Sequence, residues 1–231
     1  MNERFIRTET LIGQQNLREL KEATVMVVGL GGVGGYAAEA LVRSGVGTLI
    51  VIDHDAVEYS NFNRQILADE ESLGQKKTDV FRRRAAKINP EAEVICYDCF
   101  LTADNLESFF VRKPDYVVDA IDTLTSKVAL WKYCQENEIE IISCLGTAKK
   151  LDLTKLKITT LEKTENDPMA KALRQIARKN GLSLKVPVVF SGEQPLNRSS
   201  EVLGSMMFVP AGAGILCAQW VVSGIIDKQS N

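Results

Sequence analysis

Short apolar runs rich in valine and isoleucine alternate with segments of helical pattern between residues 24 and 144. The runs are residues 24–29, 48–53, 93–99, 116–119 and 140–144. Near-continuous apolarity predicts strands that are covered on both faces, as in a parallel sheet. Strands that alternate with helices therefore favour a doubly wound, mainly parallel α/β fold.

Helices are expected between these runs because apolar side chains recur there at helical spacing. The segments are residues 33–44, 75–89, 126–137 and, ahead of the first strand, about 10–22. In the second of them, Val80, Phe81, Ala85 and Ile88 share one face, and Pro90 then ends the helix.

The last third of the chain has a different pattern. Residues 155–161 and 184–191 indicate strands, with a basic helix at 168–179 between them. Residues 202–226 carry no charge and are long enough to span a bilayer, but Pro210, several glycines and Gln219 interrupt them. We expect a C-terminal extension of mixed strands that ends in a buried apolar helix, with no stable membrane insertion.

The charge balance and the cysteine usage narrow the class of protein. The chain has 28 basic and 30 acidic residues, so as a whole it is no generic polyanion binder. One histidine, His54, rules out a three-histidine zinc site. The polar N-terminus has no apolar signal core and the five cysteines are scattered, so we expect reduced thiols and a cytoplasmic protein.

A glycine motif follows the first expected strand and opens the next helix. Its glycines are Gly29, Gly31, Gly32 and Gly34. Such glycines let the backbone approach a phosphate, and the helix N-terminus offers unpaired N–H groups to an anion. Asp53 ends the next strand, at the position of a ribose-binding carboxylate in Rossmann-like folds. We expect a nucleotide site that includes Asp53 and the nearby Asp55, with NAD still open at this point.

The residues after Asp53 favour a triphosphate. Asn61, Arg64 and Gln65 lie just beyond the second strand, and Lys77 begins the next helix. An arginine can grip phosphate oxygens bidentately, while a lysine supplies a compact charge. A dehydrogenase needs no such pair, so we expect ATP rather than NAD.

Two carboxylates follow the fourth strand, in the sequence Asp119-Ala-Ile-Asp122. Ligands of parallel sheets lie beyond the carboxyl ends of the strands, so Asp122 should face the same crevice as the glycine motif. One carboxylate together with phosphate oxygens and waters is a usual way to hold magnesium. We therefore expect Asp122 to bind magnesium together with ATP.

The ordered set of motifs resembles the superfamily of ubiquitin-activating-like adenylating enzymes over essentially the whole chain. That resemblance implies an ATP site at Gly32, Asp53, Asn61, Arg64, Lys77 and Asp122. Arg4-Phe-Ile-Arg7 is similar to the N-terminal Arg-Tyr-x-Arg of the superfamily, whose last arginine reaches the ATP of the partner subunit. The resemblance thus implies a homodimer in which Arg7 joins Arg64, Lys77 and Asp122 in catalysis.

Further stretches resemble the branch of tRNA threonylcarbamoyladenosine dehydratases, which cyclise a modified adenosine beside the anticodon with ATP. These stretches are residues 58–66, 119–122, 158–169 and 189–192. The expected function is ATP-dependent dehydration of that nucleoside in tRNA, with a sulfur-relay protein as a further candidate partner. The alternative is an adenylyltransferase for the C-terminal glycine of a small sulfur-carrier protein, and an NAD-dependent oxidoreductase is the least favoured.

The cysteines depart from the pattern of the sulfur-carrier activators, which commonly hold zinc with two Cys-x-x-Cys pairs. Here only Cys96 and Cys99 form such a pair. We expect both to point to one face of the strand as core residues, and we predict no zinc. Cys144 ends a strand near the expected pocket but is interpreted as an inert core filler.

Basic residues are concentrated beyond the expected nucleotide site. Residues 149–185 carry ten lysines and arginines and four acidic residues, whereas the whole chain has a net charge of −2. A basic region of this kind suits phosphate contacts with RNA. We predict one adenylating domain over residues 1–231, with a nucleotide-binding half at about 1–145 and a substrate half at about 146–231.

Overall fold

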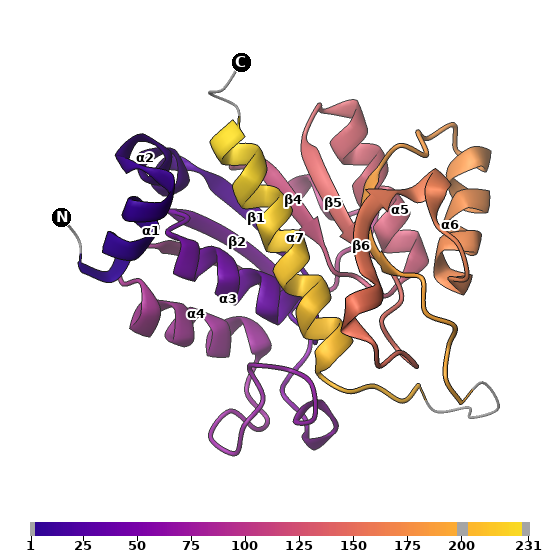
Figure 1. Cartoon of the computed structure of the whole chain (residues 1–231), viewed down its shortest axis with the longest axis horizontal. Helices are drawn as coiled ribbons and strands as arrows, with labels where there is room; N and C mark the ends of the chain where they lie inside the picture. Colours follow the sequence, from indigo (N-terminus) through magenta and orange to yellow (C-terminus); the bar gives the residue numbers. More distant parts are fainter. Residues whose placement is uncertain (1–2, 198–202, 228–231) are drawn as a thin grey trace.

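The sheet is continuous through both parts of the chain and has seven strands in the order β3-β2-β1-β4-β5-β7-β6 (Figure 1). The computed structural model describes residues 3–197 and 203–227. Neighbouring strands are parallel except for β6, which pairs with β7 in the antiparallel direction. The strands are β1 (Thr24–Val28), β2 (Thr48–Asp53), β3 (Glu93–Asp98), β4 (Tyr116–Asp119), β5 (Glu140–Cys144), β6 (Leu156–Thr160) and β7 (Pro187–Ser191).

Helices cover both faces of the sheet. The α-helices are α1 (Ile6–Ile12), α2 (Gln14–Glu22), α3 (Gly34–Ser44), α4 (Lys77–Ile88), α5 (Leu124–Glu136), α6 (Pro168–Lys179) and α7 (Phe208–Asp227). Five short 3-10 helices join them: η1 (Glu3–Phe5), η2 (Tyr59–Asn61), η3 (Leu106–Phe109), η4 (Leu153–Lys155) and η5 (Leu161–Lys163). This arrangement confirms the predicted doubly wound fold with mixed C-terminal strands.

Successive strand residues enter two separate hydrophobic cores, because side chains alternate between the faces of a sheet. On β1, Val25 and Val27 join the core beneath α3, α4 and α7, whereas Met26 and Val28 join the core beneath α5 and α6. Both faces are buried, which explains why the strands appear in the sequence as unbroken apolar runs.

Glycines allow close contacts at the junction of β1, α3 and α7. A Cβ atom at Gly34 would lie 1.7 Å from the carbonyl oxygen of Gly29, so no other residue fits this strand-to-helix turn. A Cβ at Gly214 of α7 would lie 2.2 Å from the carbonyl oxygen of Val33. The last helix therefore lies directly against the start of α3, as Figure 1 shows.

Helix α7 is buried along one face only. Val209, Cys217 and Val221 face the core, whereas Ile215 is 53% exposed. Residues Phe208–Ile226 form the one described helix that is long and apolar enough to cross a membrane, and 44% of its most apolar window is buried. The apolar sequence thus reflects burial of one face against α3 and the sheet, with Phe208 and Ile215 left exposed.

Two local expectations were wrong. The helix expected at about 10–22 is divided at Gly13, whose φ of 84° and ψ of 160° end α1 before α2 begins. Cys96 and Cys99 do not share a face, because residues three apart on a strand alternate. Cys96 packs against the core under α4, and Cys99, just beyond β3, packs against the opposite core.

Candidate functional site

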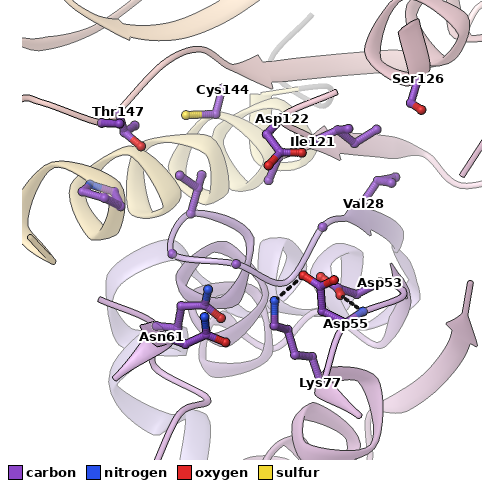
Figure 2. Close-up of a pocket in the computed structure, with 18 of the residues that line it drawn as sticks. Val28, Asp53, Asp55, Asn61, Lys77, Ile121, Asp122, Ser126, Cys144 and Thr147 are labelled. Atoms are coloured by element: carbon purple, nitrogen blue, oxygen red, sulfur yellow. Dashed lines mark hydrogen bonds and ion pairs between the residues drawn. The ribbon is translucent and has the colours of Figure 1, made fainter. Parts of the chain in front are cut away.

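A cavity of about 430 Å³ opens at the carboxyl ends of the parallel strands. It lies where the strand order reverses between β1 and β4, which is the usual ligand crevice of a doubly wound sheet. Ten of the predicted site residues line it: Gly29, Gly31, Gly32, Asp53, Asp55, Asn61, Arg64, Gln65, Lys77 and Asp122. Residues distant in the sequence thus meet at one edge of the sheet (Figure 2).

Two predicted residues do not line the cavity. Gly34 is buried beneath the glycine motif and serves the tight turn described above. Arg7 lies exposed on α1 and does not contribute to the cavity of its own chain.

Asp53 holds the glycine motif in place. Its Oδ2 accepts a hydrogen bond of 2.5 Å from the backbone N–H of Leu30, and its Oδ1 accepts one of 2.8 Å from the backbone N–H of Asp55. The carboxylate is buried, yet it still borders the cavity. Asp53 therefore orders the loop at the edge of the cavity as well as offering oxygen atoms to a ligand.

Lys77 reaches the cavity from the first turn of α4, with its side chain only 4% exposed. Its Nζ lies 2.7 Å from Asp55 Oδ2, as the dashed line in Figure 2 marks. Burial raises the pKa of Asp55, but the hydrogen bond and charge of Lys77, helped by His54 and Lys76, outweigh it and lower the pKa overall. Asp55 is therefore ionised at neutral pH and fixes the direction of the lysine.

Arg64 stands at the cavity edge just beyond η2. Its Nη1 donates to the carbonyl oxygen of Ser60 at 2.7 Å and to Asn63 Oδ1 at 2.9 Å. A Cβ built at Gly32 would lie 3.4 Å from Arg64 Cγ, so the arginine stem lies against the glycine motif. The guanidinium is thus anchored on one side and keeps further N–H groups for an anion.

Asn61 and Gln65 complete this side of the cavity. Asn61 Oδ1 accepts a hydrogen bond of 3.1 Å from the backbone N–H of Glu58. Gln65 is 8% exposed, and its Oε1 is buried without a hydrogen-bond partner among the residues that the structure describes. Buried polar atoms normally have a partner, so this oxygen suits a ligand that donates a hydrogen bond.

The two carboxylates after β4 have different surroundings. Asp119 is fully buried, and its Oδ2 accepts hydrogen bonds from Lys127 Nζ at 2.9 Å and from Trp131 Nε1 at 2.8 Å. Asp122 is exposed to the cavity, and its one hydrogen bond to a described residue is 3.4 Å long and comes from the Thr123 hydroxyl. Asp122 is therefore the carboxylate that is open to a ligand or a metal ion.

The opposite wall contains residues that sequence reasoning did not identify. Leu145, Gly146, Thr147 and Ala148 follow β5, and Met169 comes from α6. Leu203, Ser205 and Pro210 close the cavity near the start of α7. Because ligands bind beyond strand ends, the end of β5 was a recognisable signal, whereas the residues around 203–210 carry no comparable motif.

The cysteines near this wall are buried core residues. Cys144 lines the cavity, as expected, and its Sγ lies 3.4 Å from the carbonyl oxygen of Leu145. A hydrogen bond with Cys144 and complete burial raise the pKa of Cys217. A thiol with a raised pKa is a poor nucleophile at neutral pH.

The basic region has both structural and exposed members. Lys150 forms a buried ion pair with Asp167, Lys155 pairs with Asp152, and Arg174 donates to the carbonyl oxygens of residues 161 and 164. Six cations are exposed and form no ion pair with another described residue: Lys157, Lys163, Lys171, Arg178, Lys179 and Lys185. The charge available to a partner is therefore smaller than the composition suggests.

Similarity to known proteins extends over nearly the whole chain. A match to the ThiF family covers residues 4–230. The tRNA threonylcarbamoyladenosine dehydratase of Bacillus subtilis is 40% identical, over 98% of this chain and 96% of that protein. Crystal structures of the E. coli tRNA N6-threonylcarbamoyladenosine dehydratase with AMP and with ATP both have a TM-score of 0.94, cover 99% of this chain and 96% of theirs, and are 36% and 35% identical. The chain belongs to the ThiF family.

Proposed function

We propose that this protein uses ATP to adenylate the threonyl carboxylate of threonylcarbamoyladenosine in tRNA, after which the nucleoside cyclises with loss of water. The observation that carries the proposal is the likeness to dehydratases over 98% or more of the chain, with a phosphate-binding set of residues in one cavity. Relatives named as adenylyltransferases and sulfurtransferases match at 35–36% identity over only 61% of the chain.

ATP would occupy the crevice between the glycine motif and Asp122. Its phosphates would approach the backbone of Gly31 and Gly32. Asp53 would accept hydrogen bonds from the ribose, and Gln65 Oε1 would gain the donor that it lacks among the described residues. Arg64 and Lys77 would contact the phosphate oxygens as cations.

Adenylation here requires electrostatic stabilisation rather than a general base. The nucleophile is a carboxylate with a pKa of about 3.5–4, so it is already ionised at neutral pH. One of its oxygens would bond to the α-phosphorus while pyrophosphate leaves. The difficulty is that an anion approaches a polyanion, and Arg64 and Lys77 lower that barrier by balancing the charge.

Ring closure then follows within the activated substrate. The neighbouring carbamoyl group attacks the activated carbonyl and expels AMP. The reacting groups belong to one molecule, so proximity favours the reaction without an enzyme nucleophile. Buried thiols such as Cys217 are in keeping with that scheme.

Asp122 fits a magnesium site because its exposed carboxylate borders the cavity and forms no ion pair with a described residue. When bound there, magnesium would supply positive charge to the phosphates.

A homodimer would complete the site with Arg7 of the second subunit. In support, Arg7 is exposed and does not line the cavity of its own chain. Leu11 on α1 is 84% exposed and Ile215 on α7 is 53% exposed, on the face of the sheet that α3 also covers. Exposed apolar side chains on helices that cover the same face of the sheet suit contact with a second copy.

The six exposed cations around α6 and β6 would contact phosphates of the tRNA. Met169, in the first turn of α6, lines the cavity, so this basic surface begins at the rim of the site. A tRNA substrate would place the activity in the cytoplasm, with a sulfur-relay protein as a further candidate partner.

Nucleoside mass spectrometry tests the proposal. Purified protein is incubated with ATP, magnesium and tRNA that carries threonylcarbamoyladenosine, and the digest is analysed for a nucleoside lighter by one water. Its appearance supports the proposal, provided that it requires ATP. Pyrophosphate release that depends instead on a small protein ending in two glycines would indicate sulfur-carrier activation, and binding of NAD in preference to ATP would indicate an oxidoreductase.

A further inference from the structure

The cavity wall opposite the glycine motif is the β5 loop, defined here as residues 145–149. Thr147 and Cys144 face Lys77 and Asn61 across the cavity in Figure 2. The candidate ATP contacts Asp53, Asn61 and Lys77 lie on the far side of the cavity, whereas Asp122, the candidate magnesium ligand, lies on the same side as Cys144. The β5 loop is therefore placed to contact the acyl substrate rather than the nucleotide.

Lys150 anchors the end of this loop from inside the fold. Its side chain is 2% exposed, and its Nζ lies 3.1 Å from Asp167 Oδ2 and 3.0 Å from the carbonyl oxygen of Ser191. Next to it, Lys149 adopts a positive φ of 60°, and its backbone N–H donates to the carbonyl oxygen of Gly204 at 2.8 Å. The loop is thus held by several directed contacts at one end.

Asp167 connects the same anchor to the basic helix. It is the N-cap of α6, where Oδ1 accepts a hydrogen bond of 2.9 Å from the backbone N–H of Ala170. A Cβ built at Gly146 would lie 3.5 Å from Asp167 Oδ2. One carboxylate therefore lies beside the β5 loop, caps α6 and pairs with Lys150.

We propose that the Lys150–Asp167 pair is a positioning device that couples tRNA bound along α6 to the placement of its threonyl carboxylate by the β5 loop. The proposal rests on the function proposed above. Neither residue is among those that line the nucleotide cavity, so both act through other groups. Because their contacts are buried, a shift of α6 also shifts the cavity wall.

The coupling should affect the chemical step more than ATP binding. A reacting group displaced by about 1 Å can cost about a hundredfold in rate. The glycine motif, Asp53 and Lys77 belong to other elements and keep their own contacts when the β5 loop shifts.

The test uses the full chain and four variants. Lys150→Met leaves the buried Asp167 without its lysine partner, so it is accompanied by the double variant Lys150→Met/Asp167→Asn, which replaces both members of the pair. Asp167→Asn alone keeps an N-cap residue, because asparagine also caps helices. The matched control is Lys155→Met, which removes a lysine from the exposed ion pair with Asp152 in the same region.

Three quantities are measured: the midpoint of thermal unfolding, the Kd for ATP, and kcat and KM with modified tRNA. We expect the double variant to unfold at a higher temperature than Lys150→Met, to bind ATP within about twofold of the wild type, and to lose about tenfold or more in kcat. Lys155→Met should keep the wild-type kcat.

Two results would overturn the inference while leaving the proposed function in place. One is that the double variant folds and keeps the wild-type kcat, in an assay in which the wild-type protein is active. The other is an equal loss of kcat in Lys155→Met, which would show that the loss of a positive charge in this region explains the effect. A wild-type protein that does not dehydrate the nucleoside would instead remove the proposed function, and this inference with it.

Discussion

Lys77 Nζ lies 2.7 Å from Asp55 Oδ2, and both residues line the cavity proposed to bind ATP. The lysine is buried whereas the carboxylate is half exposed, so the pair is open to a competing anion. A triphosphate bound here would share the ammonium with Asp55 and be repelled by its charge.

Substitutions at the two positions should therefore change ATP affinity in opposite directions. Lys77→Met removes a charge-assisted hydrogen bond and should cost about 1.5–3 kcal/mol, or about 10- to 150-fold in Kd. Asp55→Asn removes the competing charge and should tighten ATP binding. Isothermal titration calorimetry with ATP and magnesium measures both, and weaker binding in both variants would contradict competition between Asp55 and the phosphates.

Arg64→Ala should lower turnover by about 10³-fold or more, in line with other arginines that stabilise phosphoryl transition states. Initial rates of pyrophosphate release with modified tRNA provide the measurement. Arg82→Ala is the matched control, because Arg82 is an exposed arginine on α4 that pairs with Asp79 at 3.1 Å. A loss of less than about tenfold in Arg64→Ala would show that Arg64 does not stabilise the transition state.

The carboxylate mechanism predicts the fate of one oxygen atom. When the threonyl carboxylate bonds to the α-phosphorus, one of its oxygens leaves with AMP at ring closure. Substrate labelled with oxygen-18 in that carboxylate should therefore yield AMP with one labelled oxygen, detected by mass spectrometry. Products of ADP and labelled inorganic phosphate would instead indicate activation through an acyl phosphate.

Mixing two inactive variants tests whether Arg7 acts in the partner site. In a twofold dimer of Arg7→Ala and Arg64→Ala subunits, one of the two sites has both arginines intact. After random exchange of subunits, half of the dimers are mixed, so activity should recover to about one quarter of the wild-type value. No recovery, with exchange demonstrated by sedimentation of tagged subunits, would place Arg7 outside the partner site.

Acid should weaken the contact between α3 and α4 through Glu39. Burial raises the pKa of Glu39, but hydrogen bonds and charge from Arg84 and Arg43 outweigh it and lower the pKa overall. Glu39 therefore takes up a proton more readily in the unfolded chain than in the folded protein. The stabilisation that its ion pairs provide is present above a pH of about 4.3 and is lost as the pH falls through the pKa of Glu39 in the folded protein.

Glu39→Gln should cost about 2 kcal/mol in the free energy of unfolding at neutral pH and flatten its dependence on pH in the acidic range. Urea unfolding at a series of pH values measures both effects. Glu138→Gln, at an exposed residue beyond the end of α5, is the control and should leave the free energy of unfolding at neutral pH within about 0.5 kcal/mol of the wild type. An unchanged pH profile in Glu39→Gln would contradict the role of the ion pairs.

The strands and helices followed closely from local sequence, because the sheet is covered on both faces. The expected strands at 116–119 and 140–144 and the helix at 168–179 have the observed bounds. The interruption at Gly13 and the facing of Cys96 and Cys99 were missed. A helical pattern continues across Gly13, and the odd spacing of the two cysteines places them on opposite faces of a strand.

The nucleotide side of the cavity was predictable because its residues belong to motifs at strand ends. Roles set by tertiary contacts were not. Lys127 and Lys150 resemble surface lysines in the sequence, yet each is buried against an aspartate from another element. No local pattern reports such partners, since Asp119 and Asp167 meet their lysines only after the sheet and α6 assemble.

The position of α7 has a consequence for synthesis of the protein. Pro210 of α7 borders the cavity, where a Cβ at Gly32 would lie 3.2 Å from it, and Leu203 and Ser205 lie just ahead of that helix. The ribosome makes the glycine motif well before this part of the wall. A nascent chain therefore forms the complete pocket only after residues 203–210 have emerged, and nucleotide capture has to wait for them.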